Sequence, residues 1–228
     1  MTHACPAPGA GPWVEGWLSP ARFGVYLAAT GGDRARALAL YEWNSAVACA
    51  VLHDVGHFEV ALRNAYAATL DAGWPGAAHW LYDPASPLRA PLIRTKKGGR
   101  RVDVNDKPRK AIDAARARFG PTAPPGKIIA ELSMGIWRYL SSSAHEKTLW
   151  VPYLHKAFPR GTNRATVDRK IGDLHELRNR AAHWEPLLAA PLPRLMNDLV
   201  SVAGLLSPDL AAYIQHHSQV AVLLSRRP

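Results

Sequence analysis

The sequence has little cysteine and no long apolar run, and both shortages limit what it can encode. Only two of its 228 residues, Cys5 and Cys49, are cysteines, so neither a disulfide framework nor a cysteine-based zinc site is expected. Scarce cysteine also favours a reducing compartment. Residues 1–13 lack the charged start and apolar run of a signal peptide, and we find no apolar stretch of bilayer-spanning length. We therefore expect a soluble, cytoplasmic protein with no membrane partner.

Acidic residues are also scarce. The chain has 28 Lys and Arg residues against 18 Asp and Glu residues, which gives a formal net charge of +10. A basic protein of this size attracts polyanions, and nucleic acid is the first candidate. The alternative is a solvated basic surface with no dedicated partner. A hydrophobic content of 48% is typical of a globular domain and provides enough apolar surface for a core.

The alternation that is typical of strands is almost absent, and helical spacing dominates. Apolar residues follow a helical period through the segment 34–71, where Gly56 marks a possible kink: Leu40, Trp43, Val47, Val51, Val55, Phe58 and Leu62. Shorter helices are expected over 20–30, 106–119, 127–140, 149–158, 194–206 and 209–216. Ser19 and Asp33 are expected to cap the first of these and the segment from residue 34, and Asn163 or Thr162 is expected to cap the helix that precedes Pro186. Short breaks between helices favour an all-α, up-down helical bundle. We expect a disordered tail over 1–12 and one domain over 13–228, with 73–105 as an irregular insertion.

The most informative stretch is residues 174–186, Leu-His-Glu-Leu-Arg-Asn-Arg-Ala-Ala-His-Trp-Glu-Pro. Arg178 continues an apolar helical face, where a charge needs a partner or a function. Asn179 and His183 are four residues apart and so neighbours on a second face. Pro186 ends the helix just after His183, and the C-terminal end of a helix favours positive charge.

This stretch resembles the Arg-Asn-x-x-x-His signature of the HEPN superfamily, and more narrowly that of its bacterial Abi-like (abortive infection) proteins. Other segments are similar in the same order along residues 34–216. They are Glu59-Val60-Ala61-Leu62-Arg63-Asn64, Met134-Gly135-Ile136-Trp137-Arg138-Tyr139-Leu140, Leu149-Trp150 with Ala157-Phe158-Pro159, and Ser207-Pro208-Asp209-Leu210-Ala211.

The resemblance implies a HEPN-like bundle and a metal-independent endoribonuclease with no cofactor. It assigns catalysis to Arg178 and His183, with Asn179 in support. In such a reaction the 2′-hydroxyl attacks its own phosphate and leaves a 2′,3′-cyclic phosphate. His183 suits the proton transfers and Arg178 suits the phosphate charge. The family name also implies a toxin or phage-defence role, with an antitoxin protein or RNA as a further partner.

Supporting residues come from two other segments. Glu59 and Arg63 are spaced for a helical ion pair and, with Asn64, are expected beside Arg178. The basic stretch within 94–101 is expected to be a loop that either follows an RNA backbone or is simply solvated. Its RNA-binding candidates are Lys96, Lys97, Arg100 and Arg101.

The motif raises a geometric difficulty. Arg178 and His183 are five residues apart, which is about 140° around a regular helix. Either the helix distorts before Pro186 or residues from two protomers converge, and the second option predicts a homodimer. A purely structural alternative pairs Arg178 with Glu59 and leaves His183 as a helix cap.

Two other functions compete with the nuclease. A non-catalytic RNA-binding or protein-interaction module would keep the fold without turnover. A metal-dependent HD-like phosphohydrolase is suggested by Leu52-His53-Asp54-Val55-Gly56-His57, in which His53 and His57 are spaced to share a metal. Such a site needs another His upstream, and residues 4–52 contain none. We therefore expect two ordinary helical histidines and no metal.

Overall fold

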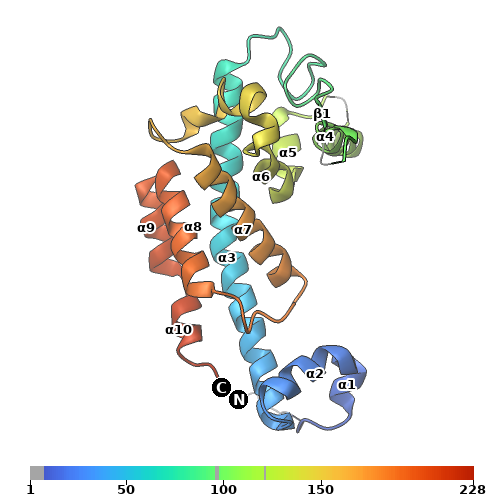
Figure 1. Ribbon diagram of the computed structural model, residues 1–228, viewed down its shortest axis with the longest axis vertical. Helices are drawn as coiled ribbons and strands as arrows, with labels where there is room; N and C mark the ends of the chain where they lie inside the picture. The colour runs from blue at the N-terminus through green and yellow to red at the C-terminus, as the bar shows by residue number, and fades with distance from the viewer. Residues whose placement is uncertain (1–7, 96–97, 121) are drawn as a thin grey trace. The chain divides into compact units, whose positions relative to one another are not determined.

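The computed structural model describes residues 8–95, 98–120 and 122–228, and nearly all of its regular structure is helical (Figure 1). Within these residues the strands are confined to one two-stranded sheet. The all-α fold class is therefore confirmed. The chain forms two compact units, Met1–Asp54 with Leu177–Pro193 and His217–Pro228, and Val55–Glu176 with Arg194–His216. One domain over residues 13–228 stays a prediction.

The first unit begins with two short helices that pack against each other (Figure 1). They are α1 (Trp13–Leu18) and α2 (Pro20–Ala29), and α3 (Arg34–Gly73) follows. Two of these helices start with the side-chain caps that the sequence predicts. The Ser19 hydroxyl accepts a hydrogen bond from the Arg22 amide at 3.4 Å, and an Asp33 carboxylate oxygen accepts one from the Arg36 amide at 3.0 Å.

Arg34 connects the start of α3 to the chain that precedes α1. Its Nε donates to the carbonyl of Ala10 and its Nη2 to the carbonyl of Gly11, both at 2.8 Å. The same guanidinium binds both carboxylate oxygens of Glu15, at 2.5 and 2.7 Å. Of the tail expected at residues 1–12, the part up to Ala7 lies outside the described residues.

A short helix that the sequence did not predict, α10 (Val220–Leu224), also belongs to the first unit. The indole of Trp43 donates to the carbonyl of Leu223 at 2.7 Å. The Arg227 guanidinium lies 5.2 Å from the Trp43 ring and donates to the carbonyl of Leu188 at 3.2 Å. Residues near position 225 therefore hold both α3 and the segment that follows α7.

The second unit contains the rest of α3 and most of the other helices. They are α4 (Asp106–Phe119), α5 (Pro125–Glu131), α6 (Met134–Leu140) and the larger parts of α7 (Arg164–Ala182), α8 (Leu192–Leu206) and α9 (Pro208–His217). The Asn163 side chain accepts from the Thr166 amide at 3.0 Å, so it caps α7 as predicted. Asp198 of α8 binds Lys170 of α7 at 3.1 Å and Arg194 at 2.9 Å, which ties these two helices together.

Helix α3 is continuous over 40 residues, so Gly56 does not divide it into two helices. Contrary to the expectation from the sequence, this helix is long and apolar enough to cross a membrane, alone among the described helices, with 39% of its apolar window buried. The core helix of a soluble protein passes the same test, so the finding is consistent with a soluble protein. The cytoplasmic location stays a prediction.

Three sequence expectations are wrong in detail. The single helix expected over 127–140 is broken between α5 and α6. Leu132 is extended there, and its carbonyl accepts a hydrogen bond from the buried Trp137 indole at 3.1 Å. The helix expected over 149–158 is replaced by short 3-10 and π turns: η1 (Ser143–His145), η2 (Glu146–Trp150) and η3 (Leu154–Ala157). The expected insertion contains an antiparallel hairpin, β1 (Ile93–Thr95) with β2 (Arg101–Asp103).

Candidate functional site

Helix α7 ends in a Schellman motif immediately after the predicted catalytic histidine. The Glu185 amide donates to the carbonyl of Arg180 at 2.9 Å, and the Trp184 amide donates to the carbonyl of Ala181 at 3.0 Å. These two bonds define the motif and make His183 the C-cap residue. The exposed His183 side chain thus lies at the negative end of the helix dipole, as the position of Pro186 had predicted.

The residue that reverses the chain is Trp184, which has a φ of 55°. This position in a Schellman motif usually belongs to glycine, since the left-handed region is unfavourable for a bulky side chain. Such strain is often found near functional sites, where the surrounding structure holds it in place. The sequence favours core positions for Trp137, Trp150 and Trp184; the first two are buried, whereas Trp184 is 39% exposed, so that expectation is wrong for Trp184.

A buried asparagine of α3 holds the segment just beyond the motif. Asn44 is 0% exposed, and its side-chain oxygen accepts from the Leu187 amide at 2.7 Å. Its side-chain nitrogen donates to the carbonyl of Glu185 at 3.3 Å. The two bonds lie on either side of Pro186 and fix the backbone that follows His183. Sequence reasoning missed Asn44, because its partners are more than 140 positions away along the chain.

Arg180 holds the same turn from within α7. Its Nη2 donates to the carbonyl of Pro186 at 2.5 Å, and its Nε lies 3.5 Å from a carboxylate oxygen of Glu185. From α2, Arg22 donates to the carbonyl of His183 at 3.4 Å. Arg180 therefore stabilises the turn.

Arg178 and Asn179 lie one helical turn before the cap, and both are half-buried. The His183 amide still donates to the carbonyl of Asn179 at 3.0 Å, so helical hydrogen bonding continues as far as the histidine. The distortion comes only at Trp184. The distortion expected before Pro186 is therefore present, but it follows His183 and leaves the helix between Arg178 and His183 regular. Their angular separation stays at about 140° for a regular helix.

The supporting residues belong to the second unit. Glu59 and Arg63 are half-buried on α3, and Asn64 is exposed. Arg63 donates to the backbone carbonyl of Ala130 in α5 at 3.3 Å. A pair between Glu59 and Arg63, and the position of either beside Arg178, stay predictions.

The described residues of the basic stretch lie in the two strands of the β1–β2 hairpin and just before β2. Arg100 and Arg101 are exposed, as an RNA-binding loop requires, whereas Lys96 and Lys97 lie outside the described residues. Arg94 has a structural role, because its guanidinium donates twice to the carbonyl of Ala144, at 3.0 and 3.1 Å.

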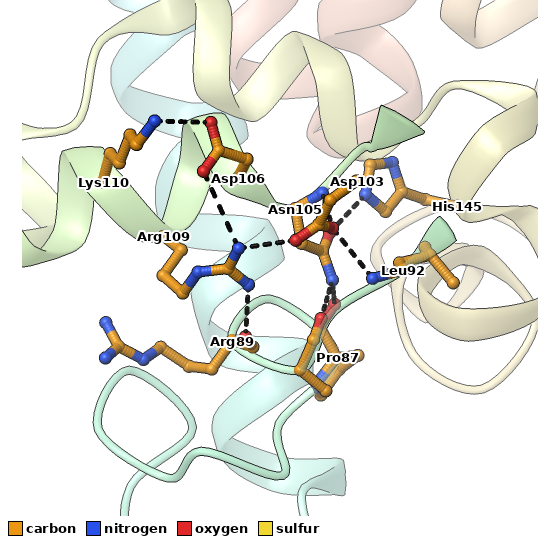
Figure 2. Close-up of polar contacts among 10 residues, drawn as sticks. Pro87, Arg89, Leu92, Asp103, Asn105, Asp106, Arg109, Lys110 and His145 are labelled. Atoms are coloured by element: carbon orange, nitrogen blue, oxygen red, sulfur yellow. Dashed lines mark hydrogen bonds and ion pairs between the residues drawn. The ribbon is translucent and has the colours of Figure 1, made fainter. Parts of the chain in front are cut away.

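A buried polar cluster anchors this hairpin (Figure 2). Asn105 donates to the carbonyls of Pro87 and Ala90 at 2.8 and 2.7 Å, so its side-chain oxygen accepts from His145 Nε2 at 2.9 Å. Asp103 accepts from Arg109 at 2.5 Å. Burial would raise the pKa of Asp103, but hydrogen bonds from Arg109 and two backbone amides lower it overall.

His145 is 0% exposed and is not used by the predicted chemistry. Burial, together with the positive charge of Arg94, lowers the pKa of His145 from 6.5 to about 4. The neutral ring donates through Nε2, and the Ser142 hydroxyl lies 3.3 Å from its Nδ1. The side chain is therefore a neutral structural element at pH 7. It lies 40 positions from Asn105 in the chain, so no local pattern reveals the pair.

The structure gives little support to an HD-like metal site at His53 and His57. His53 Nδ1 lies 2.9 Å from a carboxylate oxygen of the buried Asp54, and the His57 ring packs edge-on against Tyr213 at 5.4 Å. Across residues 8–95, 98–120 and 122–228, no three His, Cys, Asp or Glu side chains are grouped to hold a metal ion.

No protein-family model matches the chain, and no curated protein or solved structure is significantly similar to it. The candidate site therefore depends on the residues of the motif and on the geometry that surrounds them.

Proposed function

We propose that the protein is a metal-independent endoribonuclease with a HEPN-like helical bundle, in which Arg178 and His183 do the chemistry. The observation that carries the proposal is the end of α7. An exposed histidine is held at the helix C-cap by a strained Trp184 and by the clamps of Asn44 and Arg180. A histidine with only a capping role has no need of so rigid a support.

The reaction needs a base, an acid and a positive charge. The 2′-hydroxyl loses its proton and forms a bond to the adjacent phosphorus, while the bond to the 5′-oxygen of the next nucleotide breaks and that oxygen gains a proton. His183 transfers these protons. Arg178 binds the non-bridging phosphate oxygens with its planar fork and stabilises the charge of the phosphorane. Asn179 orients the phosphate or the imidazole.

A dimer resolves the angular separation of Arg178 and His183. Because α7 keeps its helical bonding as far as His183, the two side chains leave the helix in different directions. In a symmetric dimer, Arg178 of one protomer and His183 of its partner meet in one cleft. RNA reaches this cleft through the positive charge of the protein and the exposed Arg100 and Arg101 of the hairpin.

The biological role follows from the resemblance alone. A nuclease of this kind acts as a toxin or a phage-defence effector, and an antitoxin protein or RNA restrains it. The cytoplasm is the compartment in which it meets its substrate.

The test incubates the purified protein with tRNA and total RNA in EDTA, beside Arg178→Ala and His183→Ala. We expect cleavage by the wild type with 2′,3′-cyclic phosphate and 5′-hydroxyl ends, and none by either variant. His53→Ala is the matched histidine control and should cut normally. Cleavage that needs a divalent metal and His53 would support the HD-like hydrolase instead. RNA affinity without any cleavage would indicate the non-catalytic binding module.

A mixing experiment tests the shared cleft. Arg178→Ala and His183→Ala proteins, inactive alone, are combined after brief unfolding and refolding. If each cleft takes its arginine from one protomer and its histidine from the other, mixed dimers have one intact site. Random mixing then restores about a quarter of the wild-type rate. No recovery, with mixed dimers verified by mass spectrometry, would mean that each site is contained in one chain.

A further inference from the structure

A pocket of about 540 Å³ opens in the second unit just before α7. Its walls come from the segment 150–162, and they include Trp150, Val151, Phe158 and the basic residues Lys156 and Arg160. The volume falls within the range of small-molecule sites. Neither the motif nor the basic hairpin contributes to it, so the proposed chemistry leaves this pocket without a function.

The apolar side of the pocket is aromatic and rigid. Trp150 and Phe158 stack with ring centroids 5.4 Å apart and planes 25° apart, and both are nearly buried. Val151 lies beside them and is 59% exposed, which is unusual for a valine. A planar aromatic ligand would cover Val151 and the small part of the two rings that stays exposed, and burial of such apolar surface favours binding.

The other side of the pocket is cationic. Within the described residues neither Lys156 nor Arg160 makes an ion pair, and the lining that the structure describes contains no Asp or Glu. Nearby cations differ from these two, since Arg164 and Lys170 both bind carboxylates. Two exposed, unneutralised charges beside an aromatic wall favour a ligand that is both anionic and aromatic.

Local structure fixes the positions of these groups. The Thr162 amide and hydroxyl both donate to the carbonyl of Pro159, at 3.1 and 2.7 Å, and Gly161 has a φ of 87°. This is the geometry of a tight turn that needs glycine at its third position, and Arg160 is its exposed corner. A second group is fixed as well, because His155 Nδ1 donates to the carbonyl of Trp150 at 3.1 Å. His155 Nε2 is then the atom left to meet a ligand.

We propose that this pocket binds one unstacked nucleotide of single-stranded RNA, with the base against Val151 and the Trp150–Phe158 pair and the phosphates against Lys156 and Arg160. Proteins that bind single-stranded nucleic acid without sequence preference combine aromatic side chains with basic groups that contact the backbone. A duplex does not offer a free base, so the pocket selects single-stranded regions. The inference rests on the proposed function only in taking RNA as the source of the nucleotide.

The test measures binding by fluorescence anisotropy, with a labelled five-nucleotide RNA and the full chain carrying His183→Ala so that the probe is not cut. The double variant Lys156→Ala/Arg160→Ala should bind about tenfold more weakly. It should also lower the slope of log affinity against log salt by about 1.4, since each single-strand phosphate contact contributes about 0.7. Arg36→Ala/Lys147→Ala removes the same charge from exposed positions outside the pocket and should change affinity by less than about twofold.

A second variant tests the base. Val151→Ser changes a position that is exposed enough to tolerate the substitution. It should weaken binding of the five-nucleotide RNA about threefold to tenfold and leave the affinity for an abasic strand of equal length unchanged. If both strands lose affinity equally, or neither does, the pocket does not hold a base. If the control variant Arg36→Ala/Lys147→Ala lowers RNA affinity as much as Lys156→Ala/Arg160→Ala does, binding is a general charge effect and the proposal is wrong.

These outcomes are independent of catalysis. If the Arg178→Ala and His183→Ala proteins cut RNA like the wild type while the pocket variants lose affinity, the nuclease assignment fails and the nucleotide site remains. If cleavage needs the motif but the pocket variants bind and cut like the wild type, the site fails and the nuclease remains.

Discussion

The Asn44 clamp leads to a quantitative prediction about the support of His183. Replacing Asn44 by Ala removes two hydrogen bonds. One is donated by the Leu187 amide to the Asn44 side-chain oxygen, and the other by the Asn44 side-chain nitrogen to the Glu185 carbonyl. Each bond contributes about 0.5–1.5 kcal/mol, and a buried amide left without a partner adds about 1–3 kcal/mol. Because water reaches part of the opened turn, we expect a total loss of about 2–3 kcal/mol in unfolding free energy.

The assay combines urea denaturation with amide hydrogen exchange. In Asn44→Ala the Leu187 amide should exchange far faster than in the wild type, and RNA turnover should fall while RNA affinity stays the same. Ser45→Ala is the matched control on the next residue of α3, because the buried Ser45 hydroxyl has no hydrogen-bond partner in the described structure. If the two variants have equal stability within about 0.5 kcal/mol, and Leu187 keeps its protection in Asn44→Ala, the clamp does not support the site.

Three further predictions concern the turn and the buried histidine. At position 184, where φ is 55°, Trp184→Val should be about 1 kcal/mol less stable in urea than Trp184→Asn, because asparagine tolerates this backbone and a β-branched residue does not; equal stabilities would contradict the strain. Arg180→Met should lose about 1–2 kcal/mol and slow RNA cleavage while RNA affinity stays within about twofold, and a loss of affinity would place Arg180 on the RNA instead. His145 has a pKa of about 4 when folded against 6.5 unfolded, so the unfolded chain takes up the proton first as the pH falls. The stability that neutral His145 provides should therefore be complete above pH 6.5 and be lost towards pH 4, by roughly 3 kcal/mol, with a shallower decline in His145→Gln; parallel pH curves would refute this.

The parts of the fold that the sequence predicted depend on local chemistry. Ser19, Asp33 and Asn163 were identified as caps because a short polar side chain before an apolar helical period satisfies the free amides of the first turn. The exposed end of the motif helix followed in the same way from Pro186. The hairpin was missed because three-residue strands are too short to show alternation.

The parts that were missed depend on contacts between distant positions or on strain. Asn44 meets Leu187, and Asn105 meets His145, only in the folded chain. Trp184 takes a backbone conformation that its side chain disfavours, so propensity argues against the turn that the structure contains. The break at Leu132 likewise requires the Trp137 indole, whose partner cannot be chosen from spacing alone.

The composition of the first unit has a consequence for the timing of synthesis. Its surfaces come from Met1–Asp54, Leu177–Pro193 and His217–Pro228; Leu223 of α10 contacts Trp43, and Arg227, which follows α10, contacts Leu188. During translation, α1 and α2 are made first but must wait on the order of ten to thirty seconds for the segment around α10 to follow, at about 5–20 residues per second. The first unit therefore cannot be completed until the segment around α10 has been made, long after α1 and α2.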